Sequence, residues 1–281
     1  AVTPDLQGQQ HPYTEALLKH QQGTGIYVGH SSADNLKLSD QAIARARATY
    51  YAMITEVDYH IGRLLAFLKE QNVYSDTLII FTSDHGEQLG DHWQFAKYGY
   101  YDSSFHIPLI IRMPGSVYNG GRNRVVGDFT ENVDVMPTIL AALGIELPVQ
   151  CNGSSLTPLL RGLRPSNWRK CVHWEFDFAH LKDHTGSKPM LGLKRNQCGV
   201  CVARGKRYKY IHFSDLPPLF FDLAQDPYEL NNLAVDSSYS SMIAASARDM
   251  VSWRMHTEDC ELSRYEVTRD GLMMHDTSGS R

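Results

Sequence analysis

The feature that most constrains the fold is a long stretch of helical periodicity that leads into a short apolar strand. Apolar and aromatic side chains recur at helical spacing from Ile43 to Leu68, and Ser39 stands where a helix N-cap is expected. Turn residues follow at 72–76, and residues 77–82 form a continuous apolar run rich in β-branched side chains, which suits a strand buried on both faces. A helix that feeds a buried strand predicts an α/β fold.

The α/β alternation continues to about residue 148. Residues 107–113 predict a second strand, and residues 133–143 predict a helix that ends at Gly144, a residue favoured at helix C-termini. We therefore expect residues 1–148 to belong to one α/β catalytic domain. Within it, residues 1–38 lack a sustained period and predict an exposed, extended segment that contributes little to the core.

Beyond this point the pattern changes to short alternating segments, which predict a smaller α+β subdomain over residues 149–257. Its antiparallel strands are expected at residues 200–204, 208–213 and 220–223, and a helix is expected at residues 242–255. The polar residues 258–281 predict an extended tail or an oligomerisation arm.

Composition excludes several classes of partner and environment. The 281 residues carry a formal charge of −4 without a long basic cluster, which argues against nucleic acid as a partner. The apolar runs fall far short of the roughly 20 residues that span a bilayer, so no membrane segment is expected. Five scattered cysteines, an odd number, argue against a disulfide framework and favour a reducing compartment such as the bacterial cytoplasm.

The strand at 77–82 ends in a polar turn that combines two kinds of metal ligand. Asp84 offers a hard oxygen donor and His85 an imidazole, and Gly86 allows the tight bend that would bring both together. The carboxyl end of a strand is also where open α/β sheets usually build their sites. A capped turn with a hydrogen-bonded imidazole is the alternative that the residues alone leave open.

Residues 82–115 read T-S-D-H-G-E-Q-L-G-D-H-W-Q-F-A-K-Y-G-Y-Y-D-S-S-F-H-I-P-L-I-I-R-M-P-G. This stretch resembles the sulfatase and alkaline phosphatase superfamily, most specifically its phosphonate monoester hydrolase branch, and residues 48–65 and 216–234 extend the resemblance. The resemblance implies an alkaline-phosphatase-like sandwich of helices around a mostly parallel sheet. A smaller C-terminal antiparallel sheet completes the expected fold, and its N-terminal part is missing from this sequence.

The same resemblance assigns roles to residues of the motif. Asp84 and His85 would bind a divalent metal, with Mn²⁺ expected ahead of Ca²⁺, Zn²⁺ or Fe²⁺, and Lys97 would act in catalysis by contacting the charged oxygens of a small anionic ester. A metal and a lysine together stabilise the charge that phosphoryl or sulfuryl transfer places on oxygen. His92 is a second candidate for substrate binding, and the alternative is a residue that anchors the loop. A homo-oligomer, dimer or tetramer, is also implied.

The nucleophile motif of the family, C-x-P-x-R or S-x-P-x-R, does not occur in the sequence. Residues 260–264 have cysteine and arginine at the right separation, but they lack the proline and lie far downstream. We expect a formylglycine nucleophile and the remaining metal ligands upstream of Ala1, and no turnover by these 281 residues alone. The alternatives are a binding or assembly module that keeps the fold without the nucleophile, and a metal-independent oligomerisation domain.

Overall fold

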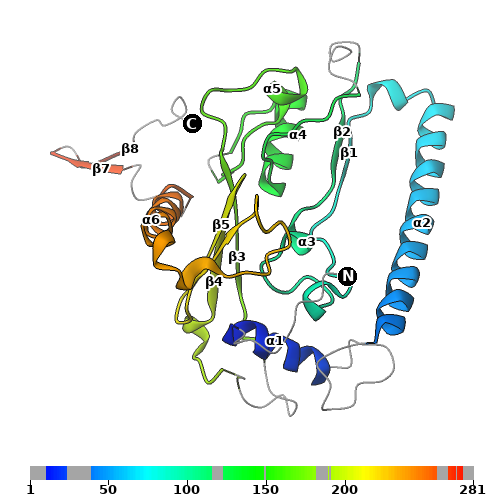
Figure 1. Cartoon of the computed structure of the whole chain (residues 1–281). Coiled ribbons are helices and arrows are strands. Elements are labelled where there is room, and N and C mark those ends of the chain that lie inside the picture. Colours follow the sequence, from blue (N-terminus) through cyan, green and yellow to red (C-terminus); the bar gives the residue numbers. More distant parts are fainter. Residues whose placement is uncertain are drawn as a thin grey trace.

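The computed structural model describes residues 11–23, 39–115, 123–148, 150–181, 189, 191–257, 265–269 and 271–274. Two groups of elements are visible in Figure 1: a long helix beside a two-stranded sheet, and a four-stranded sheet flanked by helices. The loop that carries the polar turn connects the two strands of the first group.

The predicted long helix is α2 (Asp40–Glu70), and it is confirmed over almost its whole predicted length. Its N-cap is Ser39, whose side chain accepts a hydrogen bond from the backbone N–H of Ala42 and so satisfies one of the unpaired donors of the first turn. Ile43 is its one buried residue, although the apolar stripe continues far beyond it. The short 3₁₀ turn η1 (Tyr74–Asp76) then leads the chain into the sheet.

The first sheet consists of β1 (Ile79–Thr82) and β2 (Leu109–Arg112), which pair antiparallel with Phe81 opposite Ile110. Among the described residues this sheet shows no parallel pair. The expectation that the first strand is buried on both faces is wrong here, because Phe81 is 38% exposed and Ile110 is 63% exposed. The reason is that no described layer covers the face to which these two paired side chains belong.

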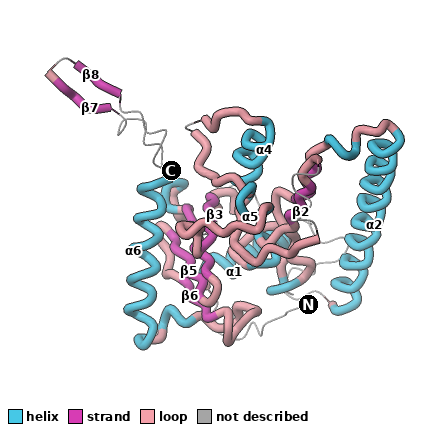
Figure 2. Tube along the Cα trace, turned by 90° about the horizontal axis from the view of Figure 1, so that it is seen from above, coloured by secondary structure: helices cyan, strands magenta, loops and turns pink. Residues whose placement is uncertain are grey.

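Helices flank this pair of strands. The helix α4 (Val135–Leu143) ends at Gly144 in a left-handed conformation, as its sequence predicts. It follows the 3₁₀ turn η4 (Asn132–Asp134) and precedes the short α5 (Thr157–Leu160). Figures 1 and 2 both show β1 and β2 between α2 and α4. The expected α/β arrangement, with helices on both sides of a sheet, is therefore present in part.

The second sheet has the order β3-β4-β5-β6, and every neighbouring pair is antiparallel. Its strands are β3 (Cys171–Asp177), β4 (Gly199–Gly205), β5 (Tyr208–Phe213) and β6 (Leu219–Asp222). The last three strands confirm the predicted antiparallel sheet, whereas β3 was not predicted. The helix α6 (Ser240–Thr257) confirms the predicted helix and covers one face, where Met250 packs with Tyr210 and Phe220.

The helix α1 (Pro12–Gly23) covers the other face of this sheet. The expectation of an exposed segment with little core is wrong for these residues, because Tyr13 and Leu17 are fully buried among residues of β4, β5 and β6. Tyr13, Ala16 and Leu17 stand at the i, i+3, i+4 spacing of an apolar helix face, which was the available signal. The core of the second sheet therefore includes residues from both sides of the predicted boundary at residue 148.

The C-terminal part of the chain contains a short hairpin of β7 (Tyr265–Thr268) and β8 (Gly271–Met274) within the predicted tail. The rest of that tail, residues 258–264 and 275–281, lies outside the described residues, as does most of the segment 1–38. None of the helices in the described ranges is long and apolar enough to cross a membrane.

Candidate active site

The predicted metal-binding turn follows directly on β1. The side chain of Asp84 is 82% exposed and its Oδ2 lies 3.4 Å from Nε2 of His85. The backbone N–H of His85 donates to Oδ1 of Asp84 over 3.0 Å, so one carboxylate oxygen is fixed by the turn and the other lies near the imidazole. The structure thus brings the two predicted ligands together at the surface.

The hydrogen bond of the other ring nitrogen determines the tautomer of His85. Nδ1 lies 2.8 Å from the carbonyl oxygen of Gly86, and because a carbonyl only accepts, Nδ1 must carry the proton. The lone pair of the neutral ring is then on Nε2, the nitrogen next to Asp84. Fixing one nitrogen by a backbone carbonyl so that the other can coordinate is typical of histidine metal ligands.

Contacts from two other segments hold this turn in place. The backbone N–H groups of Gly86 and Glu87 donate to the carbonyls of Ser104 and Ser103 over 2.7 and 3.1 Å. A Cβ atom on Gly86 would lie 2.2 Å from the Ser103 carbonyl oxygen, so no other residue fits without a shift of the backbone. From the start of η4, the side chain of Asn132 donates to the carbonyl of Ser83 over 2.9 Å.

The donor set fits a divalent metal ion only in part. A carboxylate oxygen and an imidazole nitrogen suit ions such as Mn²⁺, Fe²⁺ or Zn²⁺, but two ligands do not complete the coordination of any of them. No cluster of three or more His, Cys, Asp or Glu side chains suited to a metal occurs within the described ranges of the chain. As metal ligands, Asp84 and His85 would need further donors from outside the described residues.

Lys97 lies on the loop that returns towards this turn and its side chain is exposed. The loop is closed by Glu87, whose Oε1 accepts from the backbone N–H of Ala96 over 2.6 Å. Partial desolvation acts to raise the pKa of Asp84, but His85, backbone N–H groups and the ammonium of Lys97 outweigh it and hold that pKa below its usual value. The positive charge of Lys97 is one of the influences that lower the pKa of Asp84.

His92 occupies a different environment. It is buried, it has a left-handed backbone conformation with φ 51°, and its ring stacks on Tyr101 with the centroids 3.5 Å apart. Burial lowers the pKa of His92 to about 4, although Asp91 and a backbone hydrogen bond with Tyr228 act in the opposite direction. These contacts are those of a residue that anchors the loop, and contact with a substrate stays a prediction.

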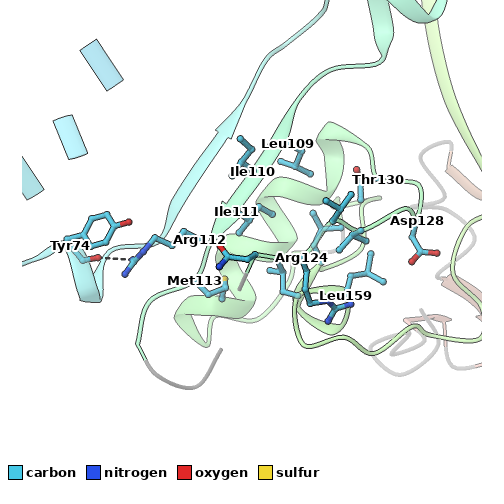
Figure 3. Close-up of a pocket in the computed structure, with 15 residues that line it drawn as sticks. Tyr74, Leu109, Ile110, Ile111, Arg112, Met113, Arg124, Asp128, Thr130 and Leu159 are labelled. Carbon is cyan, nitrogen blue, oxygen red and sulfur yellow. Dashed lines mark hydrogen bonds between the residues drawn. The ribbon is translucent and has the colours of Figure 1, made fainter. Parts of the chain in front are cut away.

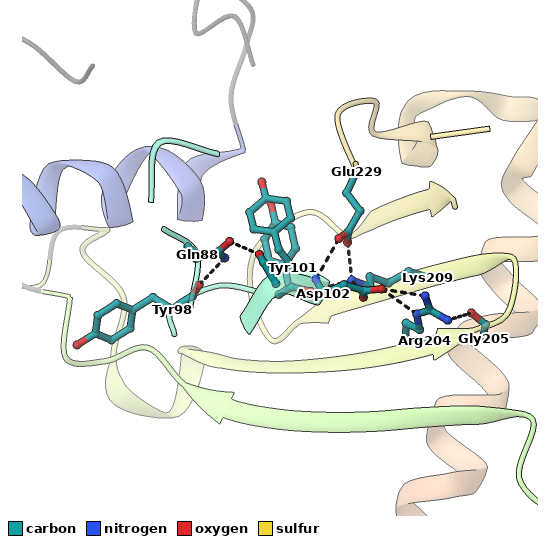
Figure 4. Close-up of polar contacts among 10 residues, drawn as sticks. Gln88, Tyr98, Tyr101, Asp102, Arg204, Gly205, Lys209 and Glu229 are labelled. Carbon is teal, nitrogen blue, oxygen red and sulfur yellow. Dashed lines mark hydrogen bonds and ion pairs between the residues drawn. The ribbon is translucent and has the colours of Figure 1, made fainter. Parts of the chain in front are cut away.

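A buried ionic cluster fixes the short helix α3 (Asp102–Phe105), which supplies the carbonyls that hold Gly86. Figure 4 shows Asp102 between Lys209 and Arg204 of the second sheet, with Glu229 bonded to both Lys209 and the backbone N–H of Asp102. Lys209 is fully buried. Burial would raise the pKa of Asp102, but Lys209 and Arg204 outweigh it and keep that pKa below its usual value.

The sequence offers no local signal for this cluster, because Asp102 lies more than 100 residues before Arg204 and Lys209 and each of these residues looks like an ordinary surface charge. Gln88 adds a second link, since its amide donates to the Tyr98 carbonyl and accepts from the Ser103 hydroxyl. The turn is thus held by α3, and α3 is held by the second sheet.

A cavity of about 640 Å³ lies beside β2, away from this turn. Figure 3 shows consecutive residues of β2 lining it, from Leu109 to Arg112, together with Leu159 of α5. Side chains from both faces of the strand contribute, so the cavity runs along the edge of β2 that β1 does not occupy. None of the predicted site residues lines it.

Comparison with known proteins identifies the family. The Sulfatase family model matches residues 5–145, and the model "N-sulphoglucosamine sulphohydrolase, C-terminal" matches residues 90–256. The multifunctional alkaline phosphatase superfamily protein PehA of Trinickia caryophylli is 42% identical over 276 residues, which cover 97% of this chain and 52% of PehA.

Two solved structures resemble the fold closely. The phosphonate monoester hydrolase of Agrobacterium radiobacter has a TM-score of 0.80 at 37% identity, covering 97% of this chain and 55% of its own. That of Silicibacter pomeroyi has a TM-score of 0.83 at 35% identity, covering 98% and 54%. The chain spans about half the length of these relatives. With these matches and an alkaline-phosphatase-like α/β fold, the chain belongs to the sulfatase family and represents the C-terminal part of its members.

Proposed function

We propose that this chain is part of a metal-dependent hydrolase of phosphonate monoesters and phosphate diesters. Asp84 and His85 supply two ligands of one divalent ion, and Lys97 binds the anionic oxygens of the substrate. The observation that carries the proposal is the pairing of Oδ2 of Asp84 with Nε2 of His85 at 3.4 Å, with Nδ1 already bound to the Gly86 carbonyl. The imidazole is thereby prepared to coordinate.

The chemistry of ester hydrolysis explains why these residue types are combined. Negative charge builds on the oxygens around phosphorus as the ester bond breaks, and a bound divalent metal would supply Lewis-acid stabilisation of that charge. The exposed ammonium of Lys97, whose charge acts on Asp84, adds a positive point charge for the anionic oxygens. Gly86 and Asn132 keep the turn fixed, so little reorganisation is needed when substrate binds.

We further propose that the nucleophile is a formylglycine on polypeptide outside these 281 residues, because the sequence contains no C-x-P-x-R or S-x-P-x-R motif. The two similar structures are both of phosphonate monoester hydrolases, which favours esters of phosphorus. Sulfate esters are the second candidate, since both matching family models carry sulfatase or sulphohydrolase names.

Paramagnetic broadening by Mn²⁺ tests the two proposed ligands without requiring turnover. In NMR spectra of the chain, we expect low concentrations of Mn²⁺ to broaden the amide signals of residues 84–86 first. Asp84→Asn and His85→Gln should each remove this selectivity. The matched controls are Asp58→Asn and His60→Gln, which change the same residue types on the exposed surface of α2 and should leave it intact. Equal broadening in all five proteins would refute the metal site.

Assays with aryl phosphonate, phosphodiester and sulfate esters in the presence of Mn²⁺ test the placement of the nucleophile. The isolated 281 residues should show no turnover of any of them. Robust turnover that Asp84→Ala abolishes would show that the nucleophile lies within this chain. A binding module without a nucleophile is favoured instead under two conditions. Mn²⁺ must bind, and a chain as long as the relatives must hydrolyse none of these esters.

A further inference from the structure

The loop over residues 88–99, which presents Lys97, has a strained backbone. Four of its residues other than glycine have left-handed φ angles, between 49° and 63°: Leu89, His92, Trp93 and Ala96. Residues with a Cβ atom rarely adopt this conformation, and it persists only where the surrounding contacts enforce it. The groups on the buried side of this loop must therefore make specific contacts with it.

Two buried glutamines supply such contacts. Gln21 of α1 is fully buried, and its side-chain amide donates to the Phe95 carbonyl over 2.7 Å and accepts from the Phe95 N–H over 3.4 Å. Gln88 is also buried and donates to the Tyr98 carbonyl over 3.3 Å, as Figure 4 shows. These side chains replace the hydrogen bonds that a regular strand or helix would give to the backbone. The buried side of the loop is therefore polar.

Gln94 is a third buried glutamine at this loop, but its amide group lacks such contacts. It is 1% exposed, and neither Nε2 nor Oε1 has a hydrogen-bond partner among the described residues. The fully buried hydroxyl of Tyr13 on α1 is likewise unpaired within the described ranges. Five buried side-chain atoms in those ranges lack a partner, and these two residues account for three of them. Because nearly all buried polar groups bond to protein or to ordered water, this concentration indicates a bound ligand.

Both unpaired groups end beside Gly99. A Cβ atom on Gly99 would lie 3.1 Å from Oε1 of Gln94, so the amide group reaches this glycine. Burial and the neighbouring Tyr100 raise the pKa of the Tyr13 phenol, whereas the backbone of Gly99 acts in the opposite direction without a hydrogen bond of good geometry. The hydroxyl therefore also lies close to Gly99. This residue has φ 100° and brings no side chain of its own to the place where the two groups meet.

We propose that Gln94 and Tyr13 bind one internal water molecule next to Gly99. The amide group of Gln94 offers donors and an acceptor, and the hydroxyl of Tyr13 offers one donor and accepts as well, which matches the hydrogen bonds of water. A buried water typically makes about three hydrogen bonds to groups that would otherwise be unpaired. Both side chains are uncharged at neutral pH, so a small neutral ligand fits this place better than an ion, whose charge they would not balance.

This water joins the strained loop to the core of the protein. Tyr13 belongs to α1, which is packed into the core of the second sheet, and Gln94 lies three residues before Lys97. The side chain of Lys97 is exposed, whereas that of Gln94 is buried, so the water holds the loop from the side opposite to the lysine. The site does not depend on the proposed hydrolytic activity, because it lies in the interior.

A crystal structure of the 281-residue chain, together with water–protein NOE spectra, tests the site. The crystal structure should show one water within about 3.2 Å of both an amide atom of Gln94 and the Tyr13 hydroxyl. In solution we expect a cross-peak between water and the Gly99 amide proton, with the sign of a long-lived internal water. Gln94→Met should lose this cross-peak, since methionine has a similar length but offers no amide group.

Tyr13→Phe is a second and milder variant, because it removes only the hydroxyl, and it should also lose the cross-peak. Gln71→Met and Tyr59→Phe are the matched controls. They make the same replacements at exposed positions, at the C-cap of α2 and within α2, and both should keep the cross-peak. Circular dichroism of each variant confirms that the fold is retained.

Three results would overturn the water site. The first is a crystal structure without a water at this place, and the second is a direct hydrogen bond between Gln94 and Tyr13. The third is a cross-peak that persists in Gln94→Met, because the exchanging hydroxyl proton of Tyr13 would then be its source. Failure of the chain or its relatives to hydrolyse any ester would refute the proposed activity but not this site, so the two proposals fail separately.

Discussion

The conformation of the Asp84–His85 turn depends on Gly86, a residue without a side chain that could bind a metal or a substrate. Gly86 passes so close to α3 that its hydrogen atom takes the place where any side chain would meet the Ser103 carbonyl. The same residue supplies the carbonyl that sets the tautomer of His85. One glycine therefore determines both the position of the turn and the nitrogen that is free to coordinate.

Replacing this glycine should be costly. We expect Gly86→Ala to lower the free energy of unfolding by about 2 kcal/mol or more, because the backbone must move away from Ser103. Gly62→Ala is the control: this residue lies within α2 with no atom near the position of a Cβ, and the change should raise stability by about 0.5–1 kcal/mol. Urea denaturation measures both. A neutral Gly86→Ala would contradict the close contact.

His92 should make the stability of the protein depend on pH. Its pKa is about 4 in the folded protein and 6.5 ordinarily, so between these values the unfolded chain binds more protons. Stability should therefore fall as the pH falls from about 6.5 to 4, by up to about 3 kcal/mol from this residue.

His92→Asn tests this dependence. Asparagine tolerates the left-handed backbone at this position but does not titrate, so the variant should lose less stability than the wild type between pH 7 and pH 4.5. His60→Asn, on the exposed surface of α2, should reproduce the wild-type slope. Parallel curves for His92→Asn and the wild type would show that His92 is not the titrating group.

At the scale of elements, the second sheet acts on the candidate site through α3. The helix has only four residues and would not be stable by itself, but Asp102 at its start is held by Lys209 and Arg204, and Glu229 accepts from its backbone N–H. Ionic contacts buried in this way are costly to break, because removing one partner leaves an uncompensated charge.

Lys209→Met should accordingly lower the free energy of unfolding by about 3–5 kcal/mol. Faster hydrogen exchange of the Gly86 amide should accompany it, because that N–H donates to the Ser104 carbonyl at the end of α3. Lys206→Met, an exposed position in the turn before the same strand, should change stability by less than about 0.5 kcal/mol. Unchanged exchange at Gly86 would show that the cluster does not act on the turn.

At the scale of the molecule, the two sheets form no hydrogen bonds with each other, but segments from other parts of the chain pack into the core of the second sheet. The core of the second sheet includes Tyr13 and Leu17 of α1 and also Tyr100 and Tyr101, which directly precede α3. Segments from the beginning, middle and end of the chain therefore fold together, and a boundary drawn along the sequence does not separate them.

Leu17→Ala tests this shared core. Leu17 is fully buried, so its truncation should lower the free energy of unfolding by about 2–5 kcal/mol. Lys19→Ala, two residues away on an exposed surface, should have an effect below about 0.5 kcal/mol. Denaturation followed by circular dichroism measures both. A small effect of Leu17→Ala would mean that α1 is not part of the cooperative core.

Features with a local physical cause could be predicted from the sequence. Helical periodicity and capping residues predicted α2, α4 and α6, and period-two alternation predicted β4, β5 and β6. The conjunction of a strand end, two ligand types and a glycine predicted the turn at Asp84 and His85. Each of these signals lies within a few residues of the structure it specifies, so sequence order and spatial proximity coincide.

The tertiary structure decided what depends on contacts between distant segments. The place of α1 in the core, the burial of Lys209 and the stacking of His92 on Tyr101 arise from packing, and local sequence does not encode it. The exposure of side chains also depends on such contacts. The apolar stripe on α2 is typical of a buried helix face, yet the described chain contains no layer that covers it. Periodicity determines which face of an element is apolar, whereas only the assembled chain determines what that face contacts.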